Sequence, residues 1–153
     1  MPNDIERVLQ LIAEAFPRLD APLPEWKGCD DVDDFLRKFG NDFFYEFWPH
    51  MYDDIEVTRF LLRFALKYYL QNHDAEQALD SADYFISRLD PEAQNESQLN
   101  WRVEELFNSL SERQQQVICE WLTVMEKNYP LLLATDGAKK YWCKNVMSTR
   151  RLC

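Results

Sequence analysis

The sequence is poor in glycine, with only three among its 153 residues, at positions 28, 40 and 137. Loops that cradle phosphate need several glycines at short fixed spacings, because the backbone must approach the phosphate closely. The three glycines here are too far apart for a Walker loop, a dinucleotide fingerprint or a serine nucleophile elbow. The sequence therefore excludes the common nucleotide-binding and serine-hydrolase motifs.

Histidine and paired cysteine are also scarce. The chain has two histidines and four cysteines, at positions 29, 119, 143 and 153, and no C-x-x-C pair. Structural zinc sites are built from closely spaced cysteine and histidine pairs, so such a site is not expected. A chain of this length buries enough surface to fold without a disulfide. We therefore expect four reduced thiols in a cytoplasmic protein.

Long apolar runs are missing as well. The longest uncharged apolar-rich segment, residues 128–135, is far shorter than the roughly 20 residues of a membrane-spanning helix. The first seven residues, Met1-Pro-Asn-Asp-Ile-Glu-Arg, carry acids where a signal peptide would carry basic residues. We expect a soluble cytoplasmic chain that does not enter a membrane.

Acidic residues are abundant. The chain has 27 acidic and 17 basic residues, which gives a net charge of −10. Residues 20–56 contain eleven acids and three bases, whereas residues 137–153 contain five bases and no acid. A field of this sign repels nucleic acid and anionic lipid and attracts basic proteins. We expect neither a nucleic-acid nor a membrane partner.

Apolar residues recur at the three-and-four spacing of helices along the whole chain, and no strand-like alternation competes with it. This pattern predicts an all-α domain of seven or eight helices over residues 1–145, followed by a basic tail over 146–153. Asn3 and Ser111 are expected N-caps, and Trp121 is expected in the core. Residues 90–97 are expected to form a polar linker. The helices are expected within residues 3–16, 31–39, 43–48, 55–70, 74–89, 99–110, 111–129 and from 136 onward.

Several short segments resemble a known group of proteins. They are Ala65-Leu-Lys-Tyr-Tyr-Leu70, Leu110-Ser-Glu-Arg-Gln114 followed by Trp121-Leu122, and Ala138-x-x-Tyr141-Trp142. Together they resemble a group of small uncharacterised bacterial helical proteins. The chain departs from that group at Gln71, where proline is usual, and at Leu62-Arg63, where Thr-Pro is usual. The resemblance implies a bacterial cytosolic helical protein and brings no chemistry with it.

Two groups of residues are candidates for a metal site. The acids of residues 30–34 lack the central glycine and the spacing of a calcium loop, and no Glu-x-x-His motif for a di-iron centre occurs. His50, the His73-Asp74 pair and Asp136 follow the order found in metal-dependent His-Asp phosphohydrolases. However, Asp74 and Asp136 are explained as helix caps, and no basic cluster near them would hold phosphate. We therefore expect no metal and no cofactor.

Aromatic residues are concentrated between positions 43 and 52, where they alternate with acids. Four of them fit one buried helical face, but Tyr45 and Tyr52 need not. Aromatic side chains ringed by acids are effective anchors for a basic partner. The alternative is that these residues are core aromatics and solvated surface charge. The candidate partner-binding residues are Tyr45, Tyr52, Asp53, Asp54, Glu56, Asp30, Asp31, Asp33 and Asp34.

The sequence thus predicts a non-catalytic bacterial interaction protein. Within that class we expect an immunity-type inhibitor that binds a basic toxin or effector through its acidic, aromatic-bearing face. A housekeeping helical binding module, or a homodimer, is the alternative. The His-Asp phosphohydrolase is the only enzyme that we retain as a further hypothesis.

Overall fold

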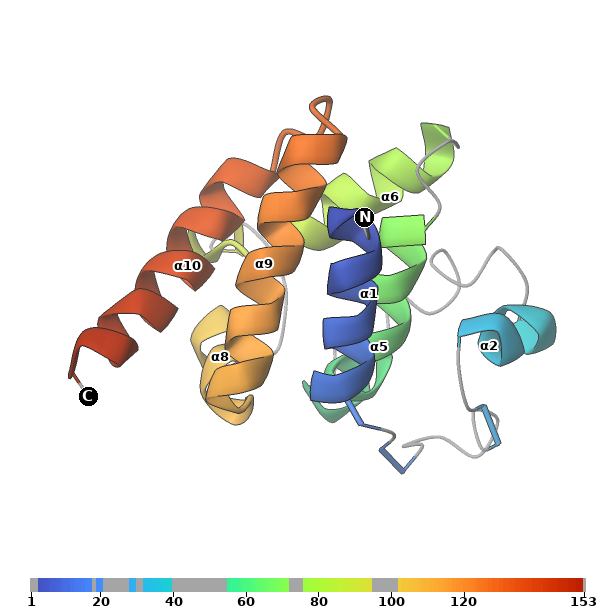
Figure 1. The fold of residues 1–153 in the computed structure, drawn as a ribbon. Helices are drawn as coiled ribbons and strands as arrows, with labels where there is room; N and C mark the ends of the chain where they lie inside the picture. The colour runs from blue at the N-terminus through green and yellow to red at the C-terminus, as the bar shows by residue number, and fades with distance from the viewer. Residues whose placement is uncertain are drawn as a thin grey trace.

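A computed structural model describes residues 3–17, 19–20, 28–29, 32–39, 55–71, 76–94 and 102–152. Within these ranges the chain forms helices and no strand, which confirms the expected all-α fold (Figure 1). No helix in them has the length and apolarity needed to cross a membrane. The helices are α1 (Asp4–Ala15), α2 (Val32–Phe39), α5 (Ile55–Gln71), α6 (Glu76–Ser87), α7 (Pro91–Gln94), α8 (Val103–Ser109), α9 (Glu112–Asn128) and α10 (Thr135–Leu152).

Local capping signals set the starts of α1 and α9. The side chain of Asn3 accepts a hydrogen bond of 2.8 Å from the backbone N–H of Glu6. Ser111 and Gln114 form a reciprocal capping box, with bonds of 3.1 and 2.9 Å. Each cap satisfies backbone donors that a helix leaves without a partner. The expected caps at Asn3 and Ser111 are confirmed.

Helix α9 occupies the middle of the bundle. It packs against α10 on one side and against α1 on the other, and α1 in turn packs on α5 (Figure 1). Helix α5 is buried over most of its length, as the density of its apolar residues predicts. Helix α6 contacts both α5 and α10 and so covers the remaining side of the core.

Two tryptophans tie the helices together. Trp121 and Trp142 are fully buried. Trp121 donates from Nε1 to the carbonyl oxygen of Leu66 at 2.9 Å, and Trp142 donates to that of Leu89, also at 2.9 Å. Each indole thus fills core volume and satisfies its only polar atom. The expected burial of Trp121 is confirmed.

Residues 90–97 are not simply a linker. Pro91–Gln94 form the short helix α7, and the Asp90 carboxylate accepts the backbone N–H of Glu92 at 3.0 Å. A capping aspartate followed by proline at the first helical position favours a helix start. The linker prediction is therefore wrong for residues 91–94, while residues 95–97 lie outside the described ranges.

Other expected elements differ in extent or cannot be compared. Helix α10 continues to Leu152, so the backbone of residues 146–152 extends the last helix. The helix expected over 43–48 lies outside the described residues. The same holds for Asp74, the expected cap of α6, whose described part begins at Glu76.

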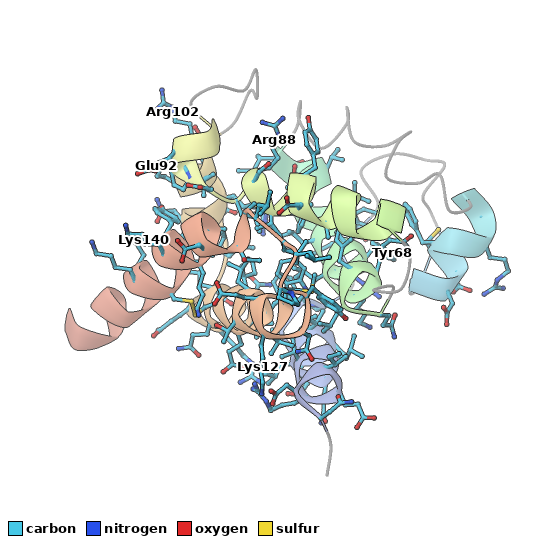
Figure 2. All side chains as sticks on the ribbon, turned by 90° about the horizontal axis from the view of Figure 1, so that it is seen from above. Tyr68, Arg88, Glu92, Arg102, Lys127 and Lys140 are labelled. Carbon is cyan, nitrogen blue, oxygen red and sulfur yellow. A yellow bond between two sulfur atoms is a disulfide. The ribbon has the colours of Figure 1, made fainter. Side chains whose placement is uncertain are left out.

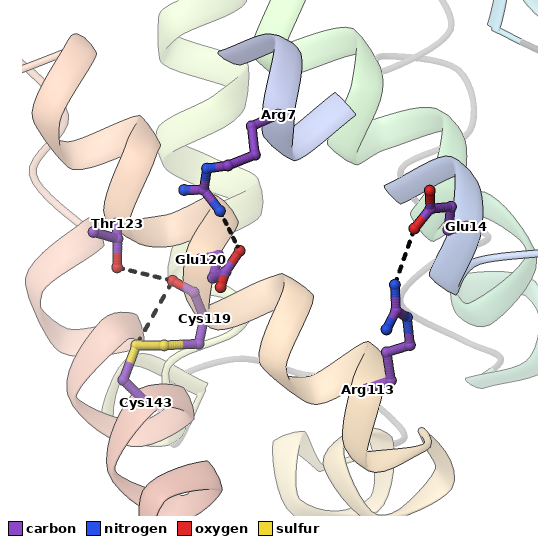
Figure 3. A network of polar contacts seen from close by, with 7 residues as sticks. All are labelled: Arg7, Glu14, Arg113, Cys119, Glu120, Thr123 and Cys143. Carbon is purple, nitrogen blue, oxygen red and sulfur yellow. Dashed lines mark hydrogen bonds and ion pairs between the residues drawn. A yellow bond between two sulfur atoms is a disulfide. The ribbon is translucent and has the colours of Figure 1, made fainter. Parts of the chain in front are cut away.

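The expectation of four reduced thiols is wrong for two of them. Cys119 of α9 and Cys143 of α10 form a disulfide, with their Cα atoms 5.0 Å apart (Figure 3). The Cys143 sulfur also lies 3.7 Å from the carbonyl oxygen of Cys119, a contact rather than a hydrogen bond because a disulfide sulfur carries no hydrogen. Cys29 is buried, and Cys153 lies outside the described residues.

Candidate binding surfaces

The structure describes three of the nine residues predicted to bind a partner. Asp33 and Glu56 are exposed, and Asp34 pairs with Arg37 one turn along α2. Asp33 lies in the first turn of α2, and Glu56 lies in the first turn of α5. Outside the described residues are Asp30, Asp31, Tyr45, Tyr52, Asp53 and Asp54.

Helix α2 is attached to α5 through aromatic rings. Phe35 is buried, and the centroid of its ring lies 4.7 Å from that of Phe64, which itself stacks on Phe60. Rings at this distance add attraction beyond the apolar area that they bury. The acids of α2 are therefore carried by a helix docked on the core and next to α5.

Only one of the four candidate metal ligands, Asp136, lies among the described residues. Asp136 is exposed within the first turn of α10, which begins at Thr135, so the prediction that it caps this helix is wrong. Its carboxylate complements the positive end of the helix dipole. Within the described ranges, no group of three or more histidine, cysteine, aspartate or glutamate side chains is arranged to hold a metal ion. His50, His73 and Asp74 lie outside these ranges.

Ion pairs run along the contact between α1 and α9. Their members are well exposed, so each pair contributes little to stability. The ammonium group of Lys127 donates to the Asp4 carboxylate and lowers the pKa of that carboxyl. Figure 3 shows the first two of the three pairs, which are Arg7–Glu120 at 2.8 Å, Arg113–Glu14 at 3.0 Å and Lys127–Asp4 at 2.8 Å.

These pairs engage part of the basic side chains, and other acids remain outside them. Lys139 of α10 is likewise engaged, by Glu126 of α9 at 3.2 Å. Within the part of the chain that the structure describes, several exposed carboxylates have no basic partner. They are Asp33 of α2, Glu104 and Glu105 of α8, Glu112 of α9 and Asp136 of α10.

A groove of about 330 Å³ lies between α7 and α10, and sequence reasoning did not find it. Asp90 and Glu92 line it from the α7 side, and Lys140 and Lys144 line it from α10. Figure 2 shows Glu92 and Lys140 on the same side of the molecule. The groove thus offers both carboxylates and ammonium groups to a ligand.

Tyr141 also lines this groove. Burial raises the pKa of its phenol, and the nearby Glu104 carboxylate raises it further. The phenol therefore stays protonated at neutral pH and can donate a hydrogen bond. Its position depends on how α7 and α10 pack, which the spacing of residues along the sequence does not reveal.

No protein-family model, curated protein or solved structure matches this chain. The structure shows a small all-helical protein. Its function therefore has to be inferred from its own residues.

Proposed function

We propose that this chain is a non-catalytic interaction protein that binds a protein partner with a basic surface. Within that class we propose an immunity-type inhibitor of a basic toxin or effector. The binding face consists of Asp33 and Asp34 of α2, Glu56 of α5 and the acidic and aromatic residues between these helices in the sequence.

The observation that carries the proposal is the excess of acidic over basic residues. The chain carries a net charge of −10. In the described part, Arg7, Arg113, Lys127 and Lys139 are paired with carboxylates of neighbouring helices, and Arg37 is paired within α2. The remaining acids produce a long-range field that attracts a cationic surface and speeds its encounter.

The cytoplasmic location expected from the sequence is part of this proposal, and the disulfide offers a test of it. Disulfides persist in oxidising compartments and are rare in the cytosol. In cells whose thiols are alkylated at the moment of lysis, a cytoplasmic chain would carry Cys119 and Cys143 as two alkylated thiols. A bridged pair would contradict the location and leave the binding proposal untouched.

The binding proposal is tested by charge reversal. The partner is first captured from the source cells on the immobilised chain, identified and purified. Its association rate is then measured for wild type and for the double variant Asp33→Lys/Glu56→Lys. We expect association to slow by about tenfold or more, because opposite charges steer the encounter.

A matched control separates this face from net charge alone. Glu105→Lys/Glu112→Lys changes the net charge by the same amount, and all four acids lie in the first turns of their helices. The two double variants thus lose similar interactions with helix dipoles. Equal slowing in both would refute the assignment of the face, and no slowing in either would refute charge-driven binding.

A further inference from the structure

The turn between α9 and α10 exposes two leucines. Leu131 and Leu133 are 80% and 85% exposed, whereas Leu132 between them is buried at 8%. Scattered exposed leucines are ordinary on protein surfaces. Here two lie two residues apart in the turn that joins α9 and α10 (Figure 1), and we call Leu131 and Leu133 the leucine tip.

The backbone of the tip is held by two helices and by a hydrogen bond within the turn. The Asp83 carboxylate of α6 accepts the backbone N–H groups of Leu133 at 2.9 Å and of Ala134 at 2.8 Å. Before the tip, buried Tyr129 donates its hydroxyl to the carbonyl oxygen of Leu70 on α5 at 3.1 Å. The N–H of Leu132 closes a turn on the carbonyl of Tyr129 at 3.0 Å.

This fixation matters for binding. A flexible apolar loop would lose conformational freedom when a partner ordered it, and that loss would weaken the complex. The tip is already ordered on both sides, so burial of its leucines costs little further backbone entropy. The fold thus presents preorganised apolar side chains to the outside.

Charge around the tip indicates what covers it. Next to it, Asp83 and exposed Asp136 have no basic side chain paired with them among the described residues. Lys127 and Lys139 are paired with Asp4 and Glu126, and Lys140, one turn after Asp136, lines the groove beside α7. This negative surround, on a chain of net charge −10, opposes contact with an anionic lipid surface and with a second copy of the same tip. It complements a pocket with a basic rim.

We propose that the leucine tip is a docking element that inserts into an apolar pocket, rimmed by basic residues, on another protein. The tip lies at the end of α5 marked by Leu70, whereas Glu56 lies at its start, roughly 20 Å along the helix. The tip is therefore a contact separate from the acidic face, and its test does not depend on that face.

The test begins with site-specific photocrosslinking in the source cells. A benzophenone side chain replaces Leu131 in the full chain, and a control chain carries it at exposed Glu112. We expect the chain with benzophenone at position 131 to crosslink to a protein other than itself. The control chain should not form this adduct. That protein is then purified, and its dissociation constant is measured for wild type, for Leu131→Ser/Leu133→Ser and for Leu19→Ser, which alters an exposed leucine elsewhere.

We expect the tip variant to weaken binding by about 30-fold, with Leu19→Ser close to wild type, because buried apolar anchors dominate interface energies. The thermal midpoint of the tip variant should equal that of wild type, since both side chains are exposed. Adducts only with a second copy of the chain, or none specific to position 131, would overturn the proposal. Flotation with phosphatidylcholine or phosphatidylglycerol vesicles that depends on the tip would also overturn it. The same holds for a dissociation constant that is equal for wild type and the tip variant.

Discussion

Trp121 both fills space in the core and forms a hydrogen bond to another helix. Its side chain is fully buried, and its indole N–H reaches α5 at Leu66. We expect Trp121→Ala to lower the free energy of unfolding by about 3–5 kcal/mol, because the cavity would persist among α5, α6 and α9. Trp121→Phe retains most of the volume and should cost less. Urea denaturation measures both, and an unchanged midpoint for Trp121→Ala would contradict the packing described.

Replacing Gly137 by alanine should lower stability, although the same substitution in a helix usually raises it. In a helix, Gly→Ala normally stabilises by about 1 kcal/mol. Here an added Cβ would lie 2.2 Å from Oδ2 and 3.0 Å from Cγ of Asp90, whose carboxylate caps α7. We expect Gly137→Ala to destabilise the protein by about 1 kcal/mol, since the Asp90 carboxylate has to move away from the new methyl group and its capping bond to Glu92 weakens.

The control for Gly137 is the same substitution in an Asp90→Ala background. Without the carboxylate, the new methyl group has room, and helix propensity alone remains. Gly137→Ala should then raise the melting temperature. If Gly137→Ala stabilised the protein in both backgrounds, the Asp90 carboxylate would be able to move away without a loss of stability, which would contradict this prediction.

At the scale of elements, the sequence allowed the starts of individual helices to be predicted, but not which helices pack against each other. Asn3 and Ser111 mark helix starts through bonds that span three residues, so their sequence context suffices. Helix α7 has only four residues, too few for a periodic apolar pattern to appear. The disulfide depends on how α9 and α10 pair, which spacing rules for metal sites do not address.

A usable signal for the disulfide was nevertheless present. Cys119 and Cys143 are each twelve residues from Leu131. In two antiparallel helices joined by a short turn, residues equidistant from the turn lie at the same height. Treating 111–129 and the following helix as a hairpin would have identified the pair.

The disulfide should stabilise this helical hairpin. It closes a loop with a sequence separation of 24, for which chain entropy predicts a contribution of about 3.5 kcal/mol. Reduction with dithiothreitol should therefore lower the free energy of unfolding of wild type by about that amount. The reductant should leave Cys119→Ser/Cys143→Ser unchanged, and equal sensitivity of both proteins would contradict the role of this bridge.

At the scale of the whole molecule, the excess of acid was readable from composition, but its distribution was not. The sequence does not reveal that Arg7, Arg113 and Lys127 are engaged by carboxylates along a helix–helix contact. Nor does it reveal that Leu132 enters the core while its two neighbours point away. Both features require the tertiary arrangement, because they arise between elements far apart in the chain.

The central claim is that charge brings the partner to this protein. The most direct measurement is the association rate of the purified partner, by stopped-flow fluorescence, from about 25 to about 400 mM sodium chloride, where the Debye length falls from roughly 20 Å to roughly 5 Å. The account predicts that the rate falls by about tenfold or more over this range, while the dissociation rate changes little. An association rate independent of salt would contradict it.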